Sequence, residues 1–480
     1  MVREMPGTAS IPPEAVSRRL ADVLAGTTYA DLPSPVVTET KRAILDWLGS
    51  ALAGAVEPAA RRMQEVVAGL GTSQESTVFA AGRSSAAGAA LANGVASHIL
   101  ELDDVHKGST LHAAAPIIPA ALGMAEREHV SGRTFILSIA LGYDAALRIG
   151  EAVNPSHYRF WHPTGTAGTF GAAVAAGTIM QLSAAQMLDA LGNAGTQAAG
   201  LWEFNSDGAM SKHLHPGKAA FNGVLSADLS RAGFTGAKRI LEGERGFLRA
   251  MSTSFDVTRI TDGLGKAWKI TENCYKLHSC CGHTHSAIDI ALNVRSQRKW
   301  SAEDVVTNVR DIHVETYGPG FEIVKEPNPR SATQAKFSIA YCVAVALLEG
   351  RVGLEQFSVE RFAPDGVCDP RIAAMLRRMR VTVEEELTQK YPSAWPARLT
   401  LALGDGSRLS GCSDYPRGNP EHPLTTSQLE EKFLVLVGSR FGSDTANSAL
   451  RTVREIEDCP DVAMLFPNVL PGDTEVQRQS

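Results

Sequence analysis

The sequence predicts a mainly α protein with a smaller α+β part placed late in the chain. Alanine- and glycine-rich segments with helical periodicity follow one another up to about residue 266. Period-two alternation, which is typical of strands, is almost confined to residues 267–413. An amphipathic segment at 426–456 is helical again. We therefore expect a helical domain (1–266), an α+β domain (267–413), and a return to the helical domain with a tail (414–480).

Bulk composition is that of an ordinary soluble globular chain with room for a large core: 480 residues, 44% of them hydrophobic and 20% charged. The net charge of −6 and the pI of about 6.1 argue against a surface that attracts nucleic acid or an anionic membrane. Residues 1–20 are polar and contain three prolines, so we expect no signal peptide. Seven cysteines, an odd number, predict free thiols and a reducing cytoplasm.

The helical part is predicted segment by segment. Ser34 and Pro35 supply an N-cap and a proline at the first helical position, and an apolar stripe continues to Gly54. Alanine and glycine dominate the later segments, which lets helices approach one another closely. These segments are 85–102, 114–129, 134–153, 165–180, 183–201 and 219–232. Residues 233–236 are typical of a helix stop, and 166–180 is too short for a membrane span.

Strand signals begin in the α+β part. Residues 309–317 alternate in polarity, and Asp405-Gly406 between two apolar runs predicts a hairpin. Further strands are expected at 380–384 and 398–403, and helices at 285–294, 335–349 and from 369 onward. A proline- and glycine-rich link at 416–423 leads to the last helical segment, and the tail after Pro460 is predicted to be poorly structured.

Histidine clusters carry the functional signal. Eleven of the 13 histidines lie between His98 and His285, beside carboxylates or lysines. The clusters are Asp103-Asp104-Val105-His106 leading to His112, Trp161-His162-Pro163-Thr164, Lys212-His213-Leu214-His215, and Lys276 to His285. Imidazole titrates near neutral pH and carboxylate neighbours tune it, so this pattern favours general acid–base chemistry on an anionic substrate. No dinucleotide-binding, phosphate-loop or nucleophile-elbow motif is present in the sequence.

In their order along the chain, these clusters resemble the MmgE/PrpD family, which includes 2-methylcitrate dehydratases, cis-aconitate decarboxylases and iminodisuccinate epimerases. The matching stretches are Leu100-Glu101-Leu102-Asp103-Asp104 to His112 with Pro119-Ala120, Trp161-His162-Pro163-Thr164 with Gly168, Lys212 through Gly217, Glu242-Gly243 with Gly246-Phe247, Lys276 through Asp289, and Ala335-Lys336-Phe337-Ser338. Each motif is weak alone. Their ordered combination is specific for the family and much less specific for one activity.

The resemblance implies a large all-helical domain built from both chain ends, a smaller inserted α+β lid domain, and a homodimer. It also implies catalysis in a cleft between the domains, without a cofactor, a metal or an iron–sulfur cluster. The implied substrate is a small di- or tricarboxylate, with neither nucleic acid nor membrane as a partner.

Four residues are predicted to be catalytic. We expect Asp103 to orient or protonate a catalytic histidine and His112 to contact substrate, the alternative being a helix cap beside a surface histidine. His162 precedes a helix start, which suits a carboxylate, unless the histidine only caps that helix. The resemblance places Lys212 in the site as a carboxylate-binding or proton-donating cation, where a lone lysine would otherwise be solvated.

The remaining candidates are predicted to bind substrate. Asp104 adjoins Asp103, and the resemblance places Lys276 and His285 near the cleft. Tyr317 stands at the end of the first strand of the α+β domain. Its hydroxyl can reach the cleft as a donor, or its ring can pack as a strand-end aromatic.

Zinc is a rival explanation for the segment 276–285, because cysteine and histidine are its ligands. Adjacent Cys280-Cys281 is not a Cys-x-x-Cys pair, however, and no second pair follows at a finger-like interval, so no metal is expected. Five positions depart from the family pattern and point to an altered substrate. They are Val105, Ala113, Ala114, His278 and Ser279.

The sequence therefore predicts a cytoplasmic, cofactor-independent lyase, a hydro-lyase related to 2-methylcitrate dehydratase that abstracts a proton next to a carboxylate. Decarboxylation of the cis-aconitate type or epimerisation of the iminodisuccinate type is the alternative, because these reactions share a carbanion-like intermediate and differ in what leaves. The alternative from another functional class is a non-catalytic carboxylate-binding relative of these enzymes.

Overall fold

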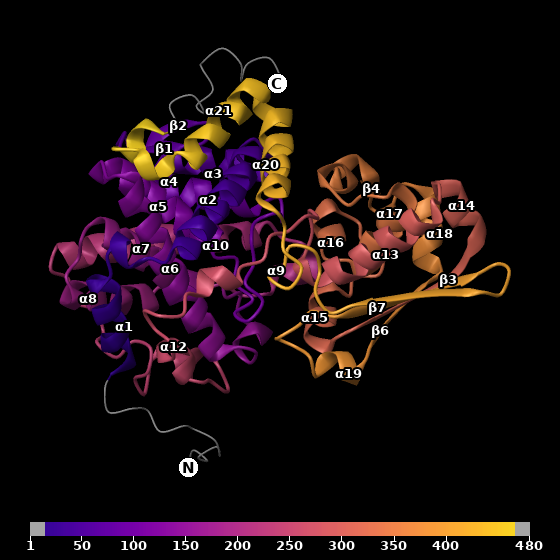
Figure 1. Cartoon of the computed structure of the whole chain (residues 1–480), viewed down its shortest axis with the longest axis horizontal. Coiled ribbons are helices and arrows are strands. Elements are labelled where there is room, and N and C mark those ends of the chain that lie inside the picture. Colours follow the sequence, from indigo (N-terminus) through magenta and orange to yellow (C-terminus); the bar gives the residue numbers. More distant parts are fainter. Residues whose placement is uncertain (1–14, 466–480) are drawn as a thin grey trace.

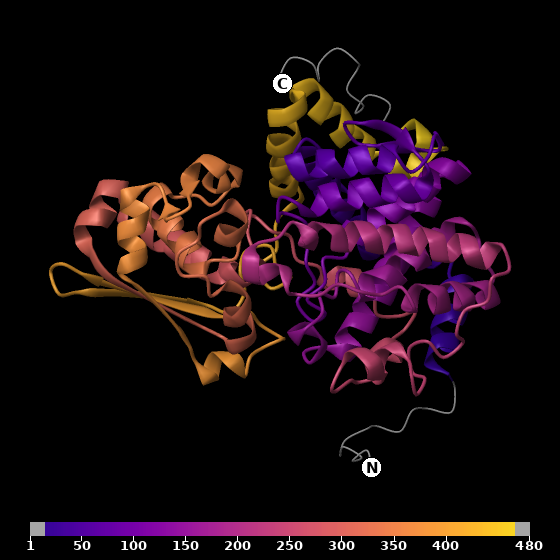
Figure 2. The same cartoon turned by 180° about the vertical axis from the view of Figure 1, so that it is seen from behind.

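The computed structural model describes residues 15–465 and contains two bodies, each with its own hydrophobic core (Figure 1). The larger core gathers helices from both ends of the described chain, and the smaller core lies within residues 280–409. We call them the helical body (15–275 and 424–465) and the α/β body (280–413). Seen from behind, the last helices lie against the helical body and the α/β body stands beside it (Figure 2). The predicted mainly α class is confirmed.

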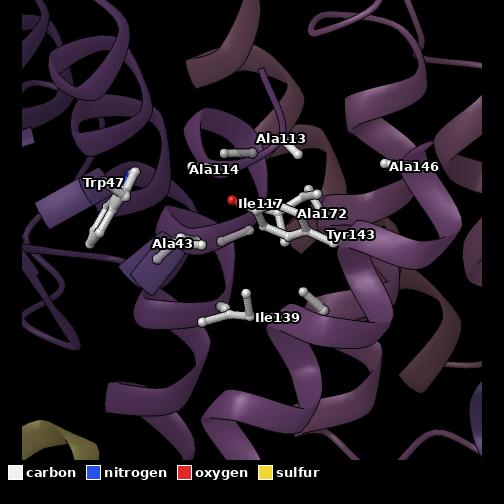
Figure 3. Packing of buried hydrophobic residues seen from close by; sticks show 14 of the residues in the cluster. Ala43, Trp47, Ala113, Ala114, Ile117, Ile139, Tyr143, Ala146 and Ala172 are labelled. Atoms are coloured by element: carbon white, nitrogen blue, oxygen red, sulfur yellow. The ribbon is translucent and has the colours of Figure 1, made fainter. Parts of the chain in front are cut away.

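The helical body consists almost entirely of helices. They are α1 (Val16–Gly26), α2 (Ser34–Ala55), α3 (Pro58–Ala68), α4 (Ala86–His98), α5 (Ala114–Glu128), α6 (Gly132–Val153), α7 (Ala167–Ile179), α8 (Ala184–Gly195), α9 (Phe204–Asp207), α10 (Ser211–Arg231), α11 (Phe247–Met251), α12 (Thr258–Thr261), α20 (Thr426–Phe441) and α21 (Ser443–Arg454). Small residues let these helices pack closely, and Tyr143 lies among Ile117, Ile139 and Ala172 in the core (Figure 3).

Several helix ends differ from the predicted ones. Segment 85–102 is helical only up to His98, because Glu101 takes a left-handed φ of +58°. The helix predicted from 219 begins at Ser211, so Gly217 lies in the interior of α10. The predicted segment 426–456 is two helices separated at Gly442, whose φ is +86°. A hairpin of two three-residue strands, β1 (Ser76–Val78) and β2 (Gly82–Ser84), is too short to leave a pattern in the sequence.

The α/β body is built on a four-stranded sheet in the order β6-β3-β7-β8. Its strands are β3 (Val309–Thr316), β6 (Met379–Val383), β7 (Ala397–Leu403) and β8 (Arg408–Ser413), with a separate two-stranded ladder of β4 (Phe362–Ala363) and β5 (Gly366–Val367). β3 is parallel to β6 and antiparallel to β7. The predicted hairpin joins β7 and β8, with Gly406 at a φ of +87°.

Helices cover one face of this sheet, as the alternation of β3 requires. Ile312 and Val314 are buried against them, whereas Asp311 is exposed (Figure 1). The helices of the α/β body are α13 (His285–Arg298), α14 (Ala302–Asn308), α15 (Gly318–Val324), α16 (Ala332–Lys336), α17 (Ile339–Glu349), α18 (Pro370–Arg377) and α19 (Glu385–Thr388). The helix predicted at 335–349 is therefore two helices, α16 and α17.

The chain passes between the bodies in two short segments. Tyr275 packs in the helical core and Cys280 in the other core, whereas the predicted boundary lay at 266/267. From Leu424 the chain is again in the helical core. No helix within 15–465 is long and apolar enough to cross a membrane. The tail predicted after Pro460 lies mostly outside the described residues, although Val462–Met464 forms a 3-10 turn.

Candidate active site

The loop that follows α4 supplies the acidic centre of the candidate site. His98, the last residue of α4, directs Nδ1 at Oδ2 of Asp103 at 2.6 Å, and both side chains are fully buried. Burial raises the pKa of the Asp103 carboxyl, but the neighbouring basic groups His98, His112 and Lys276 outweigh it and hold the pKa well below its usual value. Asp103 is therefore a permanent carboxylate that faces basic groups.

His112 stands at the end of this loop, directly before α5. Its Nδ1 lies 2.6 Å from the backbone oxygen of Asp104 and 3.4 Å from Oδ2 of Asp103. Because a carbonyl oxygen only accepts, Nδ1 carries the proton and Nε2 of the neutral ring keeps a free lone pair. Burial lowers the pKa of His112 well below 6.5. The geometry thus gives a neutral imidazole that can take up a proton.

Two buried lysine ammonium groups meet the carboxylate of Glu101. Lys212, in the first turn of α10, forms a close ion pair with Oε1 of Glu101. The Nζ of Lys276 lies 3.5 Å from Oε2 of Glu101 and 3.6 Å from Oδ1 of Asp103. Within residues 15–465 the ammonium of Lys276 has no hydrogen-bond partner, and it is only 2% exposed. A buried ammonium in that state is ready to receive a ligand carboxylate.

A group of histidine rings borders these charges. The ring centres of His98 and His112 are 4.9 Å apart, and those of His98 and His162 are 5.6 Å apart. Nδ1 of His162 lies 3.1 Å from Nδ1 of His215 on α10. Burial, with His215 and then Lys212 adding to it, lowers the pKa of His162 well below 6.5. Asp103, His112, His162, Lys212 and Lys276 therefore lie in one buried cluster, although the sequence separates them widely.

Asp104 does not join this cluster. Its Oδ2 accepts hydrogen bonds from Tyr143 at 2.7 Å and from Asn273 at 2.8 Å, and its Oδ1 accepts from the backbone of Ala114 at 3.0 Å. Burial raises the pKa of the Asp104 carboxyl to about 7. These contacts tie the loop to α5 and α6, and the substrate-binding role of Asp104 stays a prediction.

His285 and Tyr317 lie in the α/β body. His285 opens α13, with Nε2 3.3 Å from the carbonyl of Cys280. The Tyr317 hydroxyl lies 2.5 Å from Nδ1 of His283, whose Nε2 is 3.1 Å from the hydroxyl of Tyr158 in the helical body. The Tyr158–His283–Tyr317 chain thus bridges the two bodies. In the structure, Tyr317 contacts His283 and not Lys212 or His112.

Comparison with protein-family models finds two matches in the expected order. Residues 18–260 match the MmgE/PrpD N-terminal domain, and residues 278–458 match the MmgE/PrpD C-terminal domain. The chain belongs to the MmgE/PrpD family.

Among curated relatives, the chain is similar to a cis-aconitate decarboxylase-like protein of Aspergillus oryzae, at 28% identity over 96% of this chain and 98% of that protein. It is similar to the cis-aconitate decarboxylase of Aspergillus terreus, at 28% identity over 89% of each chain. A 2-methylcitrate dehydratase-like protein of Aspergillus oryzae is 25% identical over 49% of this chain and 48% of its own length. These MmgE/PrpD relatives carry the names of decarboxylases and of a dehydratase-like protein.

Three residues next to these side chains have no functional role predicted from the sequence. His98 was placed inside a predicted helix, although its spacing of five residues from Asp103 was visible. Glu101 was noted only as part of a family motif. Lys336, noted only as part of a family motif, donates from Nζ to the carbonyl of Ile99 at 3.1 Å. No local pattern in the sequence indicates that partner.

Two groups in the described part of the chain could hold a metal ion. His98, Asp103 and His112 offer ligand atoms within 4.8 Å of one another, and so do His106, Glu151 and Glu272. In the second group the Lys269 ammonium lies 3.1 Å from Glu151 and from Glu272, so a cation is already present there. Cysteine belongs to neither group, and the seven thiols are free. The expected metal-independent reaction stays a prediction.

Proposed function

We propose that this chain is a lyase that acts on a small di- or tricarboxylate by moving a proton at a carbon next to a carboxylate. One observation supports this most: the ammonium of Lys276, which has no hydrogen-bond partner within residues 15–465, and the neutral imidazole of His112 lie around the same carboxylate, Asp103. A reaction of this kind needs cations that hold carboxylates and a base that accepts a proton within one desolvated site.

The roles follow from the chemistry of each group. Lys212 and Lys276 would share their charge between Glu101 and the carboxylates of the substrate, which favours the enediolate-like charge that develops in the reaction. His112, with its free Nε2, would take the proton, and Asp103 would stabilise the resulting imidazolium. His162, whose ring centre lies 6.2 Å from that of His112, would serve as the second proton-transfer group.

Decarboxylation of a cis-aconitate-like substrate is the first reaction to test, because relatives named for it cover nearly the whole chain. In that reaction the C–C bond to one carboxylate breaks and CO2 leaves. The electron pair of that bond stays on the carbon, which then takes up a proton from the protein. Dehydration of a 2-methylcitrate-like substrate, which our sequence analysis ranked first, is second, since its relative covers half of the chain.

The test is incubation of purified protein with cis-aconitate, citrate, 2-methylcitrate and iminodisuccinate in D2O. Released CO2 with deuterium in the product supports decarboxylation. Alkene absorbance supports dehydration, and exchange without net conversion supports epimerisation. Binding without any turnover would leave only the carboxylate-binding alternative. Dialysis against a chelator is expected to leave turnover unchanged.

Two matched pairs of variants test the site. Lys212→Met and His112→Asn are expected to lower turnover roughly a hundredfold, because each removes a group that acts on the substrate. The control for the lysine is Lys325→Met in the α/β body, where the ion pair with Glu322 is exposed. The control for the histidine is His129→Asn at the exposed end of α5. Turnover equal to the controls in both site variants would reject the assignment.

We also propose that the enzyme is a cytoplasmic homodimer, as the family resemblance implies. Exposed apolar side chains support a partner surface on the helical body: Leu214 and Leu225 on α10 are 40% and 37% exposed, and Leu201 nearby in the sequence is 55% exposed. Light scattering of the purified chain decides this, and a monomer mass at micromolar concentration would contradict it.

A further inference from the structure

We propose that Lys336 of the α/β body and Ser279, in the link directly before that body, are positioning residues, which hold the loop that carries Glu101 and Asp103. The acidic pair is then in place only while the two bodies are closed on each other. Only the kinetic part of this inference depends on the proposed function.

The loop is held by its carbonyl groups. Nζ of Lys336 donates to the carbonyl of Ile99 at 3.1 Å, and Oγ of Ser279 donates to the carbonyl of Leu100 at 2.5 Å. Both carbonyls come directly after α4, where backbone oxygens have lost their partners in the helix. A lysine ammonium is also favoured at the negative end of the helix dipole.

The conformation of Glu101 explains why the loop needs support. Its φ of +58° lies in the left-handed region, which a residue with a side chain adopts only where its surroundings hold it. The carboxylate of Glu101 is 1% exposed and pairs with Lys212 and Lys276. A change in the backbone at Glu101 would therefore move the carboxylate that organises both lysines.

The two donors are anchored in the α/β body. Lys336 ends α16, and its carbonyl accepts a hydrogen bond from the backbone of Cys281 at 2.9 Å. The backbone of Ser279 donates to Val352 at 3.4 Å. If the bodies separate, the carbonyls of the loop lose these donors together.

The far end of the loop has a different anchor. Nζ of Lys432, on α20 of the helical body, donates to the carbonyl of Leu102 at 2.7 Å. This contact stays within the helical body when the α/β body moves. Separation would thus free one end of the loop and leave the other end fixed, as expected for a hinged segment.

Burial of the site makes separation necessary for entry. Lys212 and Lys276 are each 2% exposed, and His112, whose side chain is 12% exposed, is also largely covered. A polyanionic substrate cannot reach ammonium groups covered to this extent. Closure after entry would bring Lys336 and Ser279 back to the loop and complete the arrangement of the acidic pair.

Electrostatics at Lys336 agrees with a role at this junction. Burial, and then the charges of Lys212 and Lys276, lower the pKa of Lys336 to about 8, although Glu101 and Glu57 raise it. Placing this ammonium beside two others is unfavourable. The carbonyl of Ile99 and the carboxylate of Glu101 compensate for it only while the bodies are closed.

The experiment is hydrogen–deuterium exchange of the full chain, without ligand, in Lys336→Met and Ser279→Ala. Peptides covering 99–106 are expected to exchange about tenfold faster than in the parent protein in both variants, because the loop loses a donor. Lys325→Met and Ser296→Ala are the controls, since both side chains are exposed in the same body. Unchanged exchange of these peptides in both site variants would overturn the inference.

Kinetics then separates positioning from plain stability. We expect kcat to fall roughly tenfold to a hundredfold, with KM changed less than about threefold, because the charges of Lys212 and Lys276 remain to attract the substrate while the displaced acidic pair no longer fixes the geometry needed in the transition state. The double variant should be no worse than the more affected single one, since both donors act through one closure. Equal changes in KM and kcat, or additive losses, would contradict this. If the parent protein turns over no carboxylate, the proposed function fails, and the exchange measurement still decides the loop.

Discussion

At the scale of single residues, backbone geometry decides which nitrogen of a histidine reacts. Nδ1 of His112 faces a carbonyl oxygen at 2.6 Å, so Nε2 is its basic atom. Burial lowers the pKa of this ring most, Asp103 raises it, and Lys276, His98 and Lys212 lower it further. Both His112 and His162 are therefore neutral at pH 7, and both can accept a proton there.

These pKa directions predict the acid side of the activity profile. A base works only when unprotonated, so activity is lost as pH falls through its pKa. Since both pKa values lie well below 6.5, kcat/KM should stay constant between about pH 7.5 and about pH 6 and decline only below that range. The measurement is a pH profile of kcat/KM for the best substrate. An acid limb centred at 6.5 or above would show that an ordinary histidine controls the reaction.

The sequence alone could not distinguish the surroundings of the Asp103 carboxylate from those of the Asp104 carboxylate. The sequence singled out both, and the adjacent side chains turn to opposite sides of the loop. Asp103 faces His98 and Lys276, whereas Asp104 faces Tyr143 and the start of α5. The distinction depends on the left-handed backbone conformation of Glu101 and on Tyr143 and Asn273, which lie 39 and 169 positions from Asp104 in the sequence. A local sequence pattern contains neither.

At the scale of elements, α10 reaches the site because glycine lets it cross α4 closely. A Cβ on Gly217 would lie 2.5 Å from the carbonyl oxygen of Leu91 and 2.7 Å from Cγ2 of Val95. The sequence predicted the helix but not its start, because residues 212–216 contain a lysine, two histidines and a proline and therefore show no apolar helical pattern. The same start carries Lys212, so its geometry was available only from the structure.

The close crossing of α10 and α4 predicts that one added methyl group at Gly217 lowers the stability of the protein. Gly217→Ala should lower the stability by about 1–3 kcal/mol, since backbone must shift to admit the Cβ. Turnover should fall as well, because the shift moves Lys212. Gly438→Ala in α20 is the matched control: its nearest neighbour is the Cβ of Ala446 at 4.0 Å, so alanine should raise stability by about 0.5–1 kcal/mol. Thermal unfolding measures both, and equal shifts would refute the packing argument.

At the scale of the whole molecule, helix α20, near the end of the described chain, completes the core of the helical body. Leu429, Phe433 and Val437 of α20 pack with helices formed some 400 positions earlier. The sequence predicted the change from helix to α+β and back, because periodicity is a local property. It did not predict which surfaces meet, since the contacts of α20 with α2 and with the loop after α4 join distant segments.

Two ion pairs of α20 allow this long-range closure to be tested. Lys432 pairs with Asp46 of α2 at 2.6 Å, and the two side chains are 8% and 0% exposed. Arg440 pairs with Glu57 at 2.8 Å, and these side chains are 38% and 30% exposed. Removing one partner of a buried pair leaves an uncompensated charge, at a cost of about 3–5 kcal/mol, whereas an exposed pair contributes about 0–1 kcal/mol.

Lys432→Met should therefore lower the unfolding temperature by several degrees, and Arg440→Met should hardly change it. Burial already raises the pKa of Asp46, and loss of Lys432 would raise it further, so the variant should be least impaired at acidic pH, where Asp46 takes up a proton. Lys432 also donates to the carbonyl of Leu102, so the loop that carries Asp103 should exchange faster with deuterium in Lys432→Met but not in Arg440→Met. Similar small shifts in both variants would mean that apolar packing of α20, and not the buried pair, closes the helical body.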